Sequence, residues 1–285
     1  MGAAAAGPGS PGSLAGVLAA HLSTWPAPAA AGVAWGQGET ATAGWADRPF
    51  AWASVTKVLV GLSCLVAAEE GSVRLDEPAG PPGSTLAHLL AHASGLPFEG
   101  ADPVSPPGRR RIYSNSGIEL AAAHLASRTG VSFEDYLTEA VLQPLGMTAT
   151  ACPGSPAHSA AGPLVDLLAL AGELRSPTLV SPETLHEATT AWFPGLGGVV
   201  PGFGRYDPCD WGLAMEVKGP KSPHWTGRSN APSSFGHFGQ SGSFVWVDPE
   251  AGVALAALSG SPFGAWSKQA WPALSDAVLG HPAPG

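Results

Sequence analysis

Apolar positions along residues 54–71 (SVTKVLVGLSCLVAAEEG) fall on nearly every side of a helix, and the run ends at Gly71. Glycine is common just after a helix C-terminus because it adopts the left-handed conformation without strain. A helix that lacks a polar face has to be covered on all sides by the rest of the protein. The pattern therefore predicts a buried helix at the centre of the fold.

Helical and strand-like patterns also occur along the rest of the chain. Apolar residues at helical spacing predict helices, whereas short apolar runs bounded by turn residues predict strands. A turn at residues 248–252 joins the last two strands into a hairpin. The predicted helices span residues 14–22, 85–92, 117–128, 133–141, 164–174 and 266–279, and the predicted strands span residues 31–36, 211–217, 242–247 and 253–258.

The predicted strands lie near both ends of the chain, and most of the helices lie between them. This order implies an α+β fold in which one sheet is built from both chain ends beside an inserted helical subdomain. We expect the sheet from about residues 13–50 and 205–285, and the helical subdomain from about residues 72–190. Residues 1–12 are expected to form a flexible leader, so that residues 13–285 form a single domain.

Charge and composition exclude several classes of function. The 285 residues carry a formal net charge of −9 with no basic run longer than residues 109–111, so nucleic acid is not an expected partner. No apolar run reaches the roughly 18 residues that a membrane helix needs, and the N-terminus lacks the basic start of an export signal. We therefore expect a soluble, cytoplasmic protein. The three cysteines lack metal-ligand or disulfide spacing, and neither a metal nor a cofactor is expected.

Lys57 is the one charged residue between residues 51 and 68, and it falls in the first turn of the predicted buried helix. A cation there opposes the helix dipole and has to be desolvated, and both effects lower the pKa of the ammonium. The alternative is a lysine that extends to the surface at the helix end. Ser54 lies three residues earlier on the same helix face, either as a simple N-cap or as a nucleophile beside Lys57.

Two further clusters, at Tyr113-Ser114-Asn115 and His237-Phe238-Gly239, carry chemically useful side chains. A tyrosine near lysine cations can have its pKa lowered and act as a general base, and the Asn115 amide can hold a lysine or a substrate carbonyl. Gly239 allows close backbone approach on an edge strand, from which His237 would point into a cleft as a hydrogen-bonding or cationic group. The alternatives are a helix-capping turn for the first cluster and a structural histidine for the second.

The order and spacing of these clusters resemble the serine β-lactamase and penicillin-binding-protein superfamily. The S-x-x-K sequence that begins at Ser54 is followed after 59 residues by Y-S-N at Tyr113, and after another 124 residues by H-x-G at His237. S-x-x-K is the nucleophile motif of that superfamily.

Two further segments are similar to the branch that holds class C β-lactamases, D-aminopeptidases and family VIII esterases. They are LLAHASGLP at residues 89–97 and VLQPLGMTAT at residues 141–150. The resemblance covers most of residues 51–259. It implies a β-lactamase-like fold with an antiparallel sheet flanked by helices.

The resemblance implies a role for each matching residue. Ser54 would be acylated by an ester, amide or lactam carbonyl, while Lys57 and Tyr113 share the proton transfers. Asn115 would orient Lys57 and the substrate. The backbone N–H groups of Ser54 and Gln240 would form the oxyanion hole.

His237 stands where many β-lactamases carry a lysine that helps to recognise the carboxylate of β-lactams. Histidine at this position occurs in related peptidases and esterases, so the resemblance favours those activities over a dedicated β-lactamase. Three further positions are expected to contact the substrate, namely Gly239, Trp225 and Arg228.

Together these features predict a serine hydrolase, most similar to a carboxylesterase, that acts on a small ester or amide through an acylated Ser54. The alternatives among enzymes are a D-amino-acid peptidase or amidase, a weak β-lactamase and an acyltransferase of specialised metabolism. The alternative outside enzymes is a catalytically silent ligand-binding protein of the same fold. The sequence leaves open the oligomeric state, and whether Lys57 or Tyr113 is the resting base.

Overall fold

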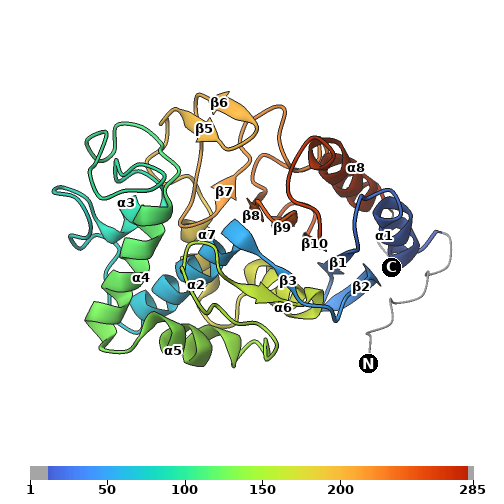
Figure 1. Ribbon diagram of the computed structural model, residues 1–285, viewed down its shortest axis with the longest axis horizontal. Coiled ribbons are helices and arrows are strands. Elements are labelled where there is room, and N and C mark those ends of the chain that lie inside the picture. Colours follow the sequence, from blue (N-terminus) through green and yellow to red (C-terminus); the bar gives the residue numbers. More distant parts are fainter. Residues whose placement is uncertain (1–11, 282–285) are drawn as a thin grey trace.

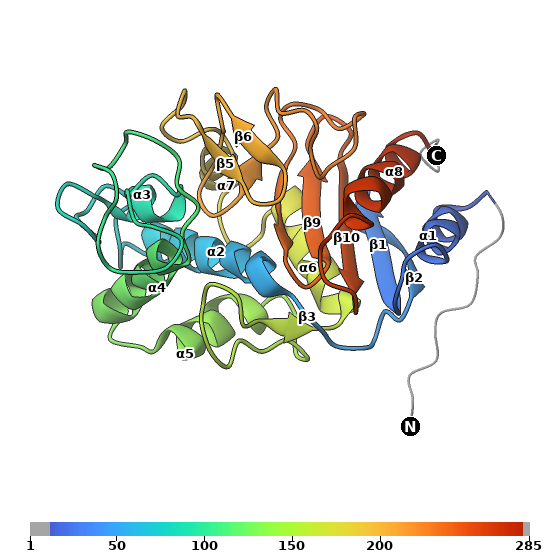
Figure 2. The ribbon, with the colours of Figure 1, turned by 45° about the horizontal axis from the view of Figure 1, so that its top comes forward.

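A computed structural model describes residues 12–281, and its centre is one antiparallel sheet (Figures 1 and 2). The six strands run in the order β2-β1-β10-β9-β8-β7. Their bounds are Ala29–Trp35 (β1), Glu39–Gly44 (β2), Glu216–Val217 (β7), Phe235–Gly239 (β8), Ser243–Asp248 (β9) and Val253–Ser259 (β10).

Both ends of the chain contribute to this sheet. The N-terminal strand β1 pairs with the C-terminal strand β10, so that Ala29 lies opposite Ser259 and Ala34 lies opposite Ala254. The predicted α+β fold with an antiparallel sheet from both chain ends is confirmed. The predicted leader lies outside the described residues, apart from Gly12.

Alternate residues of the strands face two separate cores, one on each side of the sheet. In β10, Ala254 and Ala256 belong to the larger core, whereas Leu255 and Ala257 belong to the smaller one, as the two-residue period of a strand requires. The larger core contains α2 (Thr56–Glu69) and α6 (Leu164–Arg175), and the smaller core contains α1 (Leu14–Leu22) and α8 (Ser267–Leu279). Helices therefore cover the sheet on both faces (Figure 2).

The central helix α2 is as buried as its sequence predicts. Twelve of its 14 residues are buried, and it contacts α4 and α5 on the side away from the sheet. Among residues 12–281, no helix is both long and apolar enough to cross a membrane. The remaining helices are α3 (Leu86–Leu90), α4 (Asn115–Thr129), α5 (Phe133–Leu137), which continues into a π-helical turn at Thr138–Leu142, and α7 (Pro182–Ala188).

Helix α6 does not join the helical subdomain, although it falls within the range of residues 72–190 predicted for it. It packs against β1, β9 and β10. A Cβ on Gly32 of β1 would lie 2.4 Å from the Leu168 side chain, so the glycine allows this helix to approach the sheet closely. The apolar spacing of a helix indicates that one face is buried, but it does not indicate which partner covers that face.

Of two expectations about the strands near the C-terminus, one is wrong and one holds in part. The predicted strand at residues 211–217 is mostly irregular, because Ala214 has a φ of 60° and only Glu216 and Val217 form β7. Strand β8 is expected at the edge of the sheet, and β7 covers only its first two residues, Phe235 and Gly236. Residues 237–239 of β8 therefore still lie at the edge, next to the turn that carries Ser54. The sequence pattern also does not predict β2, whose small and polar residues leave only one of its six positions buried.

A buried ion-pair network on β7 fixes the segment that follows it. Glu216 Oε1 lies 3.2 Å from both Lys221 Nζ and His224 Nε2, and the Trp225 indole donates a hydrogen bond to Oε2 at 2.7 Å. Burial raises the pKa of Glu216, but Lys221, His224 and Trp225 outweigh this effect and bring the pKa to about 2. The carboxylate therefore stays ionised and holds these three side chains beside the edge of the sheet.

Replacing this carboxylate should destabilise the fold in a pH-dependent way. Because Glu216→Gln leaves Lys221 buried without its counter-charge, we expect the free energy of unfolding at pH 7 to fall by about 3 kcal/mol. The pKa of Glu216 is depressed in the folded state, so its contribution is complete above the unfolded value of about 4.3 and is lost as the pH falls toward 2. Urea denaturation at several pH values measures both effects.

The exposed Glu250 provides the matched control. Glu250→Gln should change the free energy of unfolding by less than about 0.5 kcal/mol. Equal effects of the two substitutions, or a Glu216→Gln effect that does not shrink at low pH, would contradict the proposed role of the ion pair.

Candidate active site

The turn that carries Ser54 is held firmly against the sheet. It is a short 3₁₀-helix, Ala53–Val55, in which Ala53 has a φ of 45°. The preceding Trp52 donates its backbone N–H to the Ala160 carbonyl at 2.8 Å and accepts a 2.6 Å hydrogen bond from Ser243 Oγ on β9. These contacts maintain a backbone conformation that alanine rarely adopts, and such local strain is typical of functional sites.

Gly239, at the end of β8, allows this strand to lie against the nucleophile turn. A Cβ at this position would lie 2.3 Å from the Trp52 carbonyl oxygen and 3.1 Å from the Ala53 Cβ. The close approach brings the next residue, Gln240, beside the turn that carries Ser54. The carbonyl of Gln240 accepts a hydrogen bond from the Phe263 N–H at 2.9 Å, which restrains the end of the strand.

Lys57 is fully buried and makes three hydrogen bonds. Its Nζ lies 3.1 Å from Ser54 Oγ, 2.7 Å from Asn115 Oδ1 and 2.8 Å from the Ala157 carbonyl oxygen. Burial lowers the pKa of Lys57 to about 7, although the charge of Glu119 acts in the opposite direction. A substantial share of the molecules therefore carries a neutral amine at neutral pH.

The partners of Lys57 determine where its lone pair points when the amine is neutral. Asn115 Oδ1 and the Ala157 carbonyl are acceptors only, so each takes one of the two remaining N–H groups. The lone pair is then directed at Ser54 Oγ, which can donate its proton. The arrangement allows Lys57 to act as a general base toward the Ser54 hydroxyl.

Tyr113 is brought to the same place, but its pKa shifts in the direction opposite to the one expected from a nearby lysine. The Lys57 Nζ lies over the face of the tyrosine ring, 4.8 Å from its centroid. Burial raises the pKa of Tyr113, and a hydrogen bond with Ser54 opposes this rise only in part. The raised pKa keeps Tyr113 as a phenol at neutral pH, able to donate a proton, whereas the lowered pKa of Lys57 makes its amine able to accept one.

His237 also lies at the site, as a neutral side chain. Its Nδ1 lies 2.7 Å from the Phe238 carbonyl oxygen, which can only accept, so Nδ1 carries the proton. Its Nε2 is then an acceptor and lies 3.5 Å from the Tyr113 hydroxyl. Burial first, and then the charge of Lys57, lower the pKa of His237 to about 3. Of the two roles expected from the sequence, the hydrogen-bonding one fits and the cationic one does not.

His92 supports Tyr113 from behind, and sequence reasoning does not identify it. Its φ of 54° is unusual for a histidine, its Nδ1 accepts the Ser114 backbone N–H at 3.2 Å, and its ring lies 4.6 Å from the ring of Tyr113. Burial, followed by the charges of nearby cations, holds the pKa of His92 well below its usual value. The available signal was its place in the segment LLAHASGLP, which resembles the family.

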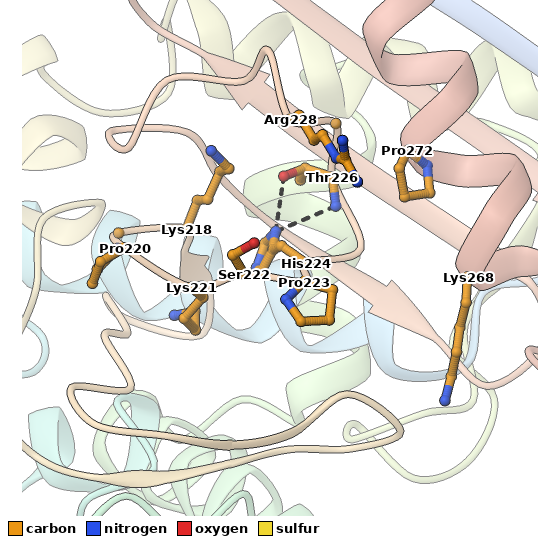
Figure 3. A pocket seen from close by; sticks show the side chains of 12 residues that line it. Lys218, Pro220, Lys221, Ser222, Pro223, His224, Thr226, Arg228, Lys268 and Pro272 are labelled. Atoms are coloured by element: carbon orange, nitrogen blue, oxygen red, sulfur yellow. Dashed lines mark hydrogen bonds between the residues drawn. The ribbon is translucent and has the colours of Figure 1, made fainter.

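The structure does not place Trp225 or Arg228 at this site. Trp225 is 1% exposed, and its ring packs in the smaller core against Phe238 and Phe244. Arg228 is exposed and lines a separate cavity of about 400 Å³ next to α8. Figure 3 shows this cavity, whose lining includes Lys218 and Pro272 but neither Ser54 nor Tyr113. A surface-loop pattern does not reveal that Glu216 draws the segment around Trp225 inward.

Metal binding has no support among residues 12–281. No group of three or more histidine, cysteine, aspartate or glutamate side chains there could hold an ion. The three cysteines are buried free thiols.

Comparisons with known proteins give the family. The sequence model of the family described as Beta-lactamase matches residues 27–279. The chain belongs to the Beta-lactamase family. A structure of a β-lactamase from Mycobacterium bovis is 50% identical to it, with a TM-score of 0.89 over 90% of this chain and 96% of that one.

Comparisons at lower sequence identity add a further structure of the same fold and two curated relatives. The structure of EstCE1, described as a hydrolase with promiscuous acyltransferase activity, is 17% identical with a TM-score of 0.77, and it covers 94% of this chain and 97% of that one. A β-lactamase from Escherichia coli K12 is 30% identical over 35% of this chain, and penicillin-binding protein 4* from Bacillus subtilis 168 is 25% identical over 52%. The matched regions span 34% and 40% of the length of these two relatives.

The lowered pKa of Lys57 can be measured directly because the chain contains only four lysines. In protein labelled with ¹³C-lysine, we expect one Cε resonance to titrate near pH 7, since burial disfavours the ammonium. Asn115→Asp should raise this pKa by about 1–3 units, because it places a carboxylate against Nζ. NMR titration of the wild type, of Asn115→Asp and of a third protein, Glu119→Gln, provides the measurement.

Glu119→Gln is the control of opposite sign. It removes the charge that raises the pKa of Lys57, so it should shift the resonance to lower pH. A Lys57 resonance that titrates above pH 9, or one that neither substitution shifts, would refute this description of the site.

Proposed function

We propose that the protein is a serine hydrolase of small esters or amides, most similar to a carboxylesterase, that works through an acylated Ser54. The observation that carries this proposal is the 3.1 Å contact between Ser54 Oγ and a buried Lys57 whose pKa is lowered to about 7. A serine hydroxyl is a weak nucleophile unless an adjacent base removes its proton. Lys57 is placed and tuned to do this near neutral pH.

In the acylation step, the lone pair of Lys57 takes the Ser54 proton as Oγ attacks the substrate carbonyl. The backbone N–H groups of Ser54 and Gln240 are the proposed donors to the resulting oxyanion, and Gly239 brings the second of them close. Asn115 and the Ala157 carbonyl hold Lys57 throughout, and they also stabilise the ammonium that forms.

The leaving group needs a proton, and Tyr113 is the proposed donor. Because burial raises its pKa, the phenol keeps its proton until the leaving oxygen or nitrogen becomes strongly basic. The Lys57 ammonium then returns a proton to the Tyr113 oxygen, so the free enzyme is ready again once the acyl group leaves. Water, activated by the same pair, releases the acid and restores Ser54.

A neutral His237 favours ester or amide hydrolysis over specialised β-lactam hydrolysis. A dedicated β-lactam site needs a cation for the carboxylate of its substrate, and the lowered pKa of His237 removes that charge at neutral pH. β-Lactam hydrolysis is nevertheless the second candidate, because the protein whose structure is 50% identical is described as a β-lactamase.

Intact-protein mass spectrometry can test the nucleophile. Wild-type protein incubated with a fluorophosphonate, a p-nitrophenyl ester or a penicillin should form a Ser54-dependent adduct or turn the reagent over. Ser54→Ala should lose the adduct and at least about 10³-fold in kcat/KM, because removing the nucleophile removes the covalent pathway. Nitrocefin hydrolysis measured in parallel ranks the β-lactam candidate.

Ser229→Ala is the matched control, since Ser229 is exposed and lies on the segment that packs away from the site. It should react like the wild type. If neither the wild type nor the control forms an adduct or turns over any reagent, the hydrolase proposal is wrong and a ligand-binding role replaces it.

The pH dependence of kcat/KM tests the identity of the base. Only the neutral amine of Lys57 can accept the Ser54 proton, so kcat/KM should rise tenfold per unit of pH below about 7 and level off above it. Asn115→Asp should shift this limb to higher pH by the same 1–3 units as the Lys57 resonance. A limb near pH 10 would identify the Tyr113 phenolate as the base instead.

A further inference from the structure

A second cavity, of about 470 Å³, opens beside Tyr113. Its size lies within the range typical of small-molecule sites. The segment between α3 and α4 forms one wall, and the hairpin of β5 (Gly198–Val200) and β6 (Gly204–Tyr206) forms the other. These two parts lie next to each other in both views (Figures 1 and 2). We call it the Tyr113 pocket and define it by Phe98, Val104, Arg110, Tyr113, Val199 and Arg205.

The walls of the Tyr113 pocket are unusually apolar for an exposed surface. Phe98, Val104 and Val199 are 52%, 56% and 52% exposed, and they are the three most exposed large hydrophobic side chains among the described residues. Single exposed hydrophobic residues are ordinary, but a cluster around one cavity marks a binding surface. The pocket therefore suits the apolar arm of a ligand.

The rim of the same pocket is cationic. Arg110 and Arg205 are exposed, and within residues 12–281 no acidic side chain lines the cavity. Arg205 lies directly opposite Val199 in the β5–β6 pair, so both side chains emerge on one face. Arg110 Nη2 donates to the Val104 carbonyl at 3.1 Å, which keeps its guanidinium near the apolar wall. The Asp207 carboxylate lies behind the wall at Gly197, but no salt bridge of the described residues pairs Arg110 or Arg205 with a carboxylate. Two unpaired cations at the rim, in a chain of net charge −9, indicate an anionic ligand group.

The pocket is built onto the residues that carry the proposed chemistry. The Phe98 and Tyr113 rings stack with centroids 6.0 Å apart, and the Phe98 carbonyl accepts the Asn115 N–H at 2.8 Å. On the other wall, the Arg111 backbone N–H donates a hydrogen bond to the Gly197 carbonyl oxygen at 2.9 Å. A Cβ on Gly198 would lie 2.5 Å from the Arg111 Cβ, so the hairpin is packed tightly against the segment that leads to Tyr113.

We propose that the Tyr113 pocket binds an apolar arm of the substrate that ends in a carboxylate or a similar anion. The catalytic part of this proposal rests on the proposed hydrolase function, whereas the binding part does not. The substrate class is then an ester or amide that carries an anionic group several bonds from the scissile carbonyl, either on the acyl chain or on the leaving group.

Matched ester pairs test the proposal in turnover. One pair is p-nitrophenyl hexanoate and the mono-p-nitrophenyl ester of adipic acid, and the other is phenyl hexanoate and 3-(carboxymethyl)phenyl hexanoate. In at least one pair, wild-type protein should show a kcat/KM for the anionic ester at least about tenfold above that for the neutral one, as one charge-assisted hydrogen bond would provide.

Substitutions of the rim arginines should abolish this preference. In Arg110→Gln and Arg205→Gln, the ratio of anionic to neutral kcat/KM should fall several-fold each, and in Arg205→Glu it should invert. Arg109→Gln is the matched control. It also removes one positive charge, at the residue next to Arg110, but the Arg109 side chain does not line the pocket. A ratio near one in both wild-type pairs, or equal losses in the control, would overturn the proposal.

A binding measurement separates this proposal from the hydrolase proposal. Calorimetry with the Ser54→Ala protein should show octanoate binding at least about tenfold more tightly than octanamide. When Arg110→Gln and Arg205→Gln are added to Ser54→Ala, this difference in affinity should disappear. If every ester fails to react but octanoate binds in this way, the hydrolase proposal fails and the pocket stands. If octanoate does not bind, or binds no better than octanamide, the pocket proposal is wrong.

Discussion

The burial of the Lys57 amine is the constraint on which the arrangement of the site depends. A lysine removed from water is costly unless acceptors surround its nitrogen. Of its three partners, Ser54 lies on the same turn, whereas Asn115 and Ala157 lie 58 and 100 residues further along the chain. The fold therefore has to bring the start of α4 and a long loop onto the first turn of α2, and these contacts assemble the site.

The sheet supplies the opposite side of the site and determines its rigidity. Ser243 on β9 binds the Trp52 carbonyl, and Gly239 on β8 packs against the same turn, so the nucleophile is fixed relative to two paired strands. Tyr113 and Asn115 come from the helical side. The reacting groups thus meet where the two halves of the molecule join, and binding sites commonly form at such junctions.

The features that could be predicted from the sequence are those that depend on spacing between nearby residues. Ser54 and Lys57 are three residues apart on one helix, so their contact follows from helix geometry alone, and the alternation of strands and helices gives the α+β fold. The state of Tyr113, the tautomer of His237 and the inward position of Trp225 depend on burial and on partners far along the chain. Tyr113 shows the difference most clearly, because a nearby lysine was expected to lower its pKa, and desolvation raises it instead.

The third partner of Lys57 is a main-chain carbonyl, that of Ala157. Any amino acid at position 157 would offer the same oxygen, so the identity of that side chain carries no direct information about the lysine. The same loop reaches the nucleophile turn through its backbone at Ala160, which binds Trp52 and the Thr56 hydroxyl. The side chains of Ala157 and Ala160 are buried in the larger core, so packing restricts what can stand there, while the lysine itself depends on the path and length of the loop.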